Sequence, residues 1–115
     1  MTSSGIDLSL FSELQNTAGA DFVVELVDTF LEEAPGMLAE LRSARAVTDA
    51  DRFRRAAHSL KSNSHTFGAL DLGALARDLE LTGMSANAAQ DATRLDALEA
   101  EYARVAAALK DLCHG

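Results

Sequence analysis

One segment, residues 49–67, constrains the fold of this 115-residue chain more than any other feature. Placed on a helix at about 100° per residue, its apolar and small residues gather in a stripe about 100° wide, which is typical of a helix that buries one face. His58 lies about 160° around the helix from Leu60, so its side chain is expected to point to solvent. The members of the stripe are Phe53, Ala56, Ala57, Leu60, Ser64 and Phe67.

The charge around His58 is unusual for this chain. Residues 52–68 contain no Asp or Glu, although the chain has 18 acidic residues and a net charge of −8. A solvated basic face fits Arg54, Arg55 and Lys61 but does not explain this absence of acidic residues, which favours a surface for an anionic group or an acidic partner. Because an exposed imidazole is a competent nucleophile for phosphoryl transfer at cellular pH, the pattern favours a phosphohistidine at His58.

The same stretch carries a family resemblance. Residues at matching identity and spacing are Ala57, His58, Leu60, Lys61, Ser64, Gly68, Ala69, Leu72, Leu75, Leu79 and Glu80. Their order resembles the histidine-containing phosphotransfer (HPt) family, whose pattern is approximately Ala-His-x-Leu-Lys-Gly-x-Ser, then Gly-Ala, then Leu-x-x-Leu-x-x-x-Leu-Glu. The chain departs from this pattern at Ser62, where the family usually has Gly.

The resemblance implies a role for three residues. His58 would be the phosphorylated residue, and Lys61, one turn further along the same side, would offset charge on the phosphoryl oxygens. Glu80, on the following helix, would hydrogen-bond the imidazole and hold one tautomer. An ordinary surface lysine and a solvated helix charge remain the alternatives for Lys61 and Glu80.

Access to His58 and docking of a partner are expected to involve the residues around it. Ser62 narrows the space that glycine would leave one turn after His58. His65 is expected to be a plain surface histidine and not the phosphorylation site. The full expected set is Arg54, Arg55, Ser62, His65 and Gly68.

Composition predicts an all-α fold in a single domain over residues 1–115. One Pro, no Trp and no alternating β-branched run of strand length favour helices, and amphipathic helices with short turns favour an antiparallel four-helix bundle with a short additional N-terminal helix. Residues 1–5 are predicted to be mobile. The expected helices cover residues 7–18, 21–47 with a bend at Pro35–Gly36, 49–67 and 69–83, and a last one that follows a connection over residues 84–92.

Helical spacing also predicts the buried faces. We expect the second helix to bury residues through Val47, and the fourth to bury a face that includes Leu75. The short N-terminal helix is expected to serve partner docking more than the core. The expected core residues of the second and fourth helices are Phe22, Val23, Leu26, Val27, Phe30, Leu31, Met37, Leu38, Leu41, Ala44, Val47, Leu72, Leu75, Ala76 and Leu79.

Several classes of protein fit the sequence poorly. Binding of nucleic acid needs a wide Lys/Arg surface, and a chain with 10 basic and 18 acidic residues does not supply one. No apolar run approaches the roughly 18 residues of a membrane span, and residues 1–5 lack the features of a signal peptide, so a cytoplasmic protein is expected. The single Cys113 fits a reducing compartment. The chain has no Glu-x-x-His pair, Cys/His zinc pattern or phosphate-binding glycine loop, which argues against a metal enzyme.

The resemblance therefore predicts a monomeric phosphocarrier without kinase activity of its own. His58 would accept a phosphoryl group from a receiver-domain aspartyl phosphate, supplied by a hybrid sensor histidine kinase, and pass it to another response-regulator receiver domain. No cofactor is expected on this chain, because the receiver's carboxylates would hold the magnesium ion. A helical adaptor that is never phosphorylated is the alternative.

Overall fold

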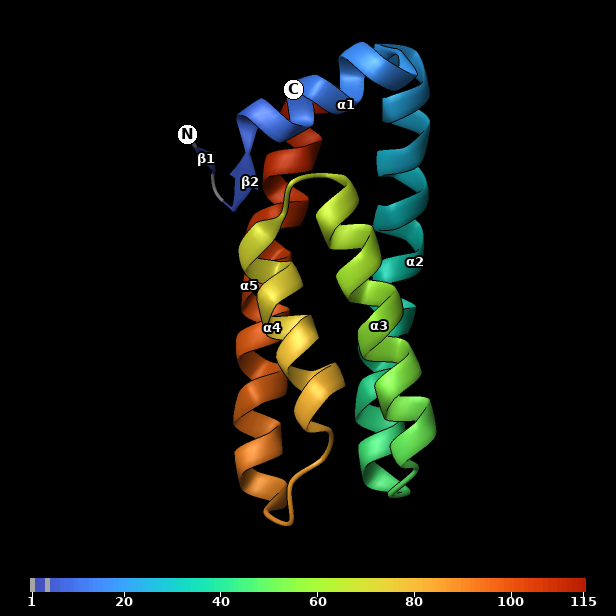
Figure 1. The fold of residues 1–115 in the computed structure, drawn as a ribbon, viewed down its shortest axis with the longest axis vertical. Coiled ribbons are helices and arrows are strands. Elements are labelled where there is room, and N and C mark those ends of the chain that lie inside the picture. The colour runs from blue at the N-terminus through green and yellow to red at the C-terminus, as the bar shows by residue number, and fades with distance from the viewer. Residues whose placement is uncertain (1, 4) are drawn as a thin grey trace.

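The computed structural model describes residues 2–3 and 5–115, which form an elongated bundle of 43 × 22 × 22 Å (Figure 1). Four helices run antiparallel along the long axis, and a short N-terminal helix crosses one end, where both chain termini also lie. This arrangement confirms the predicted all-α class. The helices are α1 (Leu8–Ala18), α2 (Ala20–Ala46), α3 (Ala50–Thr66), α4 (Leu70–Thr82) and α5 (Ala88–His114).

A minimal strand pair precedes the bundle. β1 (Thr2–Ser3) and β2 (Ile6–Asp7) pair antiparallel, in a segment where the sequence has no strand-like alternation. Met1 and Ser4 lie outside the described residues, and the mobility of residues 1–5 stays a prediction. Two residues per strand leave the fold all-α.

Side-chain caps fix where three helices begin. Asp7, Asp49 and Asn87 each accept a hydrogen bond from the backbone N–H three residues on, at 3.1–3.2 Å. The first two caps lie where helices were expected to begin, at residues 7 and 49. The third starts α5 at Ala88, so the predicted connection over residues 84–92 is wrong: the sequence after Asn87 contains good helix formers, and the real connection is shorter.

The second helix continues without interruption through Pro35, as one 27-residue element. A single long element was predicted here and is confirmed; the predicted bend stays a prediction. Pro35 and Gly36 are both exposed, so the helix tolerates them on its solvent side.

The core is continuous along the bundle, and three predicted members lie outside it. Phe22 is 51% exposed because it sits about 100° around α2 from the buried Val23. Val47 is 63% exposed because α2 ends before it, and Leu75 is 36% exposed at the edge of the α4 stripe. The largest fully buried apolar side chains are Ile6, Val23, Val27, Leu41, Phe53, Leu60, Leu72, Leu79, Leu98, Val105 and Leu109.

The N-terminal helix contributes to the core, contrary to expectation. Ile6 is fully buried and Phe11 is 3% exposed, both within the main core cluster. They occupy the positions before the Asp7 cap and in the first turn of α1 that form a hydrophobic staple. Leu10, on the same helix, is 38% exposed.

Candidate functional site

His58 lies in the middle of α3 with its side chain 54% exposed. Its neighbours Ala57 and Leu60 are fully buried, so the helix is anchored on one side and presents the imidazole on the other. The outward orientation predicted from helical periodicity is therefore found. One ring nitrogen, Nδ1, lies 2.6 Å from Oε2 of Glu80 in α4.

Glu80 holds both His58 and Lys61. Its second oxygen, Oε1, forms an ion pair with Nζ of Lys61 at 2.7 Å. The Glu80 side chain is 14% exposed and the Lys61 side chain 22%. The Lys61 ammonium lowers the pKa of Glu80, burial opposes this, and His58 lowers the pKa further, with a net shift below the ordinary value. Glu80 is therefore an anion at neutral pH.

The turn between α3 and α4 brings this group together. Gly68 adopts a φ of 78°, a left-handed conformation that glycine adopts readily, and the chain reverses direction there. His58 and Glu80 are each eleven residues from Ala69, so two antiparallel helices place them at the same height. Ser64 is fully buried next to the turn, and its Oγ donates a hydrogen bond to the carbonyl of Leu60 at 2.6 Å.

The basic surface predicted from residues 52–68 is largely compensated by carboxylates. Arg54 and Arg55 both pair with Asp51, at 2.8 and 3.0 Å. Arg52 pairs with Glu40 of α2 at 2.7 Å. The sequence signal for Asp51 was available, because it lies three and four residues before its partners on one helix. Glu40 carries no local signal, since it comes from another element.

The remaining predicted access residues differ in exposure. Ser62 and His65 are exposed on α3. The His65 ring packs against the backbone of α4 at Gly73, where a Cβ atom would collide with it. Gly68 is buried, and its carbonyl accepts a hydrogen bond from the backbone N–H of Asp7 at 2.8 Å, so it lies beneath the surface instead of on it.

Other kinds of site find no support in the described part of the chain. Among residues 2–3 and 5–115, no three His, Cys, Asp or Glu side chains cluster in a way that would hold a metal ion. None of the helices described there is long and apolar enough to cross a membrane.

The fold and this site define a helical-bundle protein that presents a carboxylate-held histidine to solvent. The family model of the Hpt domain matches residues 25–108, and the chain belongs to that family. The protein is therefore a phosphotransfer module of phosphorelay signalling, which interacts with receiver domains of two-component systems. No curated protein and no solved structure matches the chain significantly.

Proposed function

We propose that His58 is the phosphorylated residue of a phosphorelay intermediate, which accepts a phosphoryl group from one receiver domain and passes it to another. The observation that supports this most strongly is the hydrogen bond between Nδ1 of His58 and Glu80 at 2.6 Å. An ionised carboxylate only accepts hydrogen bonds, so Nδ1 carries the proton and Nε2 keeps its lone pair. Nε2 is the nucleophile.

The atoms, electrons and protons of the transfer balance without an added base. Nε2 attacks the phosphorus of the receiver's aspartyl phosphate, an N–P bond forms, the P–O bond breaks, and its electron pair returns to the receiver's carboxylate. The imidazole keeps its Nδ1 proton and gains a positive charge, which the adjacent Glu80 carboxylate stabilises. Transfer to the second receiver reverses these bond changes.

Lys61 assists the phosphorylated state in this proposal. Its ammonium lies 2.7 Å from Glu80 and belongs to the residue one turn after His58. When the Lys61 ammonium turns from the Glu80 carboxylate to the phosphoryl oxygens, it exchanges one ion pair for another. Lys61 is therefore paired both before and after His58 is phosphorylated.

The partners follow from the same chemistry. We propose that a hybrid sensor histidine kinase supplies the phosphoryl group through its receiver domain and that a response regulator takes it up. The magnesium ion for the transfer would be held by the receiver's carboxylates. The protein would act as a monomer, without autonomous kinase activity.

The test is phosphoryl transfer from phosphorylated receiver domains of the source organism. Wild-type protein should acquire an acid-labile, base-stable phosphate on Nε2 of His58, and His58→Gln should remain folded but acquire none, because an exposed side chain contributes little packing. Labelling of His65 or His114 in the His58→Gln variant would overturn the assignment. Failure of the wild type to accept phosphate from any receiver would favour the adaptor.

A further inference from the structure

The contact with Glu80 fixes the direction in which the free ring nitrogen of His58 points. Glu80 belongs to α4 and also pairs with Lys61, which lies about 60° around α3 from His58. Nδ1 faces that side, so Nε2, on the other edge of the ring, points to solvent and away from α4. A phosphoryl group on Nε2 would therefore have Lys61 on one side and would expose its other side toward α2.

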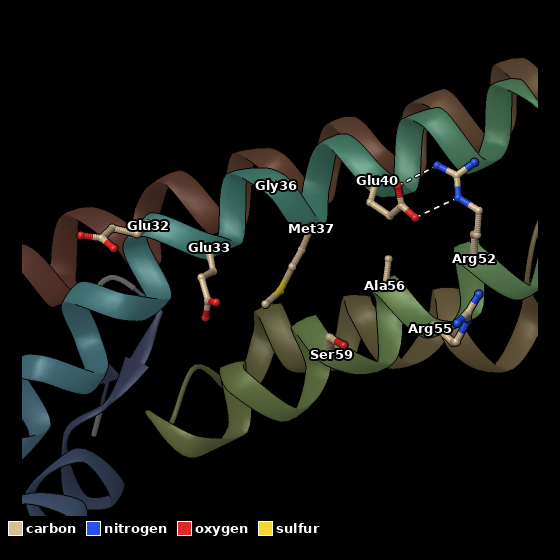
Figure 2. Close-up of a pocket in the computed structure, with 9 residues that line it drawn as sticks. All are labelled: Glu32, Glu33, Gly36, Met37, Glu40, Arg52, Arg55, Ala56 and Ser59. Carbon is tan, nitrogen blue, oxygen red and sulfur yellow. Dashed lines mark hydrogen bonds and ion pairs between the residues drawn. The ribbon is translucent and has the colours of Figure 1, made fainter.

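The α2 side of His58 is rich in negative charge. Arg55 and Ser59, about 60° and 100° around α3 from His58 in the direction opposite to Lys61, face α2 across an open groove (Figure 2). The α2 wall of that groove carries three carboxylates, those of Glu32, Glu33 and Glu40. Because like charges repel, a phosphoryl group that carries two negative charges needs a cation on this side.

Arg55 is placed to supply that cation. It lies three residues before His58, and the Cβ atoms of residues at this spacing are about 5–6 Å apart, a gap that an arginine side chain spans. Helical side chains lean toward the N-terminus of their helix, so the imidazole of His58 leans over the turn that contains Arg55. The guanidinium can therefore reach phosphoryl oxygens on Nε2.

The present partner of Arg55 can release it. Arg52, in the same helix, is held by two hydrogen bonds to Glu40 of α2, at 2.7 and 2.9 Å. Arg55 instead pairs with Asp51 of its own helix at 3.0 Å, and the two side chains are 65% and 60% exposed. Such an exposed pair adds little to stability. Asp51 also pairs with Arg54 at 2.8 Å, so it keeps a partner when Arg55 leaves.

We propose that Arg55 is a second phosphoryl-binding residue, which leaves Asp51 and binds the phosphoryl group on Nε2 of His58 from the side opposite Lys61. Two cations then flank the group, and the planar guanidinium donates two hydrogen bonds to two of its oxygens. This inference rests on the proposed function, because it takes His58 to be the phosphorylated residue.

The experiment loads His58 with phosphoramidate, a small donor that needs no docked receiver. Nε2 attacks the phosphorus, an N–P bond forms, and the P–N bond of the donor breaks with its electron pair leaving on ammonia. Phosphorus NMR follows the loading rate and the pH at which the phosphoryl group on His58 titrates. His58→Gln gives the background from other histidines, and circular dichroism confirms that each variant is folded.

Arg55→Gln should raise the pKa of the phosphoryl group by about 0.5–1 unit and slow loading about three- to tenfold, because a bound guanidinium favours the dianion. Arg55→Lys keeps the charge and should recover most of the pKa shift. Arg54→Gln removes the same charge and another ion pair of Asp51, and it should change both quantities less than a third as much. Lys110→Gln removes an exposed charge from α5 and should match wild type.

A double-mutant cycle tests whether Asp51 holds Arg55 in reserve. Asp51→Asn should lower the phosphoryl pKa, because it removes a nearby negative charge and also frees Arg55. In the Arg55→Gln background the same substitution should lower that pKa by less, and the difference measures the coupling between the two residues. An equal effect in both backgrounds would overturn the exchange of partners.

Failure of this inference and failure of the proposed function give different results. If wild type carries phosphate on His58 and Arg55→Gln has the same phosphoryl pKa and loading rate, the role of Arg55 is overturned and the proposed function stands. Equal effects of Arg54→Gln and Arg55→Gln would also overturn it, since they would show only a general effect of charge. If wild type acquires no phosphate on His58 from phosphoramidate or from any receiver domain, both are overturned.

Discussion

At the scale of single residues, the decisive feature is that one carboxylate contacts both the imidazole of His58 and the ammonium of Lys61. Glu80 contacts His58 at 2.6 Å and Lys61 at 2.7 Å, so the three side chains respond as a unit when any of them changes. An amide in place of Glu80 could turn either its accepting oxygen or its donating NH2 group toward His58, and it would carry no charge to stabilise the phosphorylated ring. The ionised carboxylate can only accept a hydrogen bond, and it supplies the negative charge.

Replacing Lys61 by Ala should slow phosphoryl transfer about ten- to a hundredfold, the order expected for losing a charge-assisted contact of about 1.5–3 kcal/mol. Single-turnover rates measure the effect, and Lys61→Arg, which keeps the charge, should recover part of it. Denaturation midpoints should barely change. A large loss of helicity combined with unchanged transfer would show that Lys61 is structural.

Periodicity predicted the orientation of His58, because a helix places residues at known angles and the apolar stripe showed which direction faces the core. The proximity of Glu80 needed the family resemblance, since no local pattern relates residues 22 positions apart. The neutralisation of Arg52 was missed for the same reason: Glu40 reaches it across a helix–helix contact that the sequence does not encode locally.

At the scale of elements, the N-terminal helix has a structural role that its length and polar surroundings concealed. Phe11 is 3% exposed, and its staple partner Ile6 is fully buried. The ends of α1 were predictable from caps and glycines. Its burial was not, because it depends on a long-range contact in which the backbone N–H of Asp7 in β2 donates to the carbonyl of Gly68.

Phe11→Ala should therefore lower the free energy of unfolding by about 3 kcal/mol, the usual cost of emptying a buried aromatic site. Urea denaturation followed by circular dichroism measures this, with the exposed Ser12→Ala on the same helix as the control. A cost below about 1 kcal/mol for Phe11→Ala would mean that α1 is only loosely attached and is available for docking, as the sequence had suggested.

At the scale of the whole molecule, ion pairs between helices tie the bundle together away from its histidine. Asp91 is fully buried and pairs with Arg45 of α2 at 2.7 Å and with Arg94 at 3.0 Å. Burial alone would raise the pKa of Asp91, but hydrogen bonds from Ser85 and the two arginines outweigh it, and the net shift is downward. The Arg42 guanidinium likewise lowers the pKa of Glu99 against a smaller opposing effect of burial.

A carboxylate whose pKa is lowered by folding stabilises the native state above its unfolded pKa, and this contribution disappears as the pH falls through the folded pKa. The bundle should therefore keep its stability from neutral pH down to the ordinary carboxyl range and lose it below that range. Thermal melts between pH 7 and pH 2 measure this. Asp91→Asn should cost about 2 kcal/mol at pH 7 and flatten the acid dependence. An acid profile unchanged by Asp91→Asn would show that other carboxylates control it.

The placement of both chain ends at one end of the bundle has a practical consequence for how the molecule can be held (Figure 1). A tether or a fused domain attached at either terminus leaves from the end where α1 crosses, and the connection between α4 and α5 projects away from it. Anchored molecules would therefore stand with the same end outward whichever terminus is attached. Exchanging an N-terminal for a C-terminal tag in an immobilised receiver-binding assay should therefore leave the presentation of His58 to the receiver unchanged.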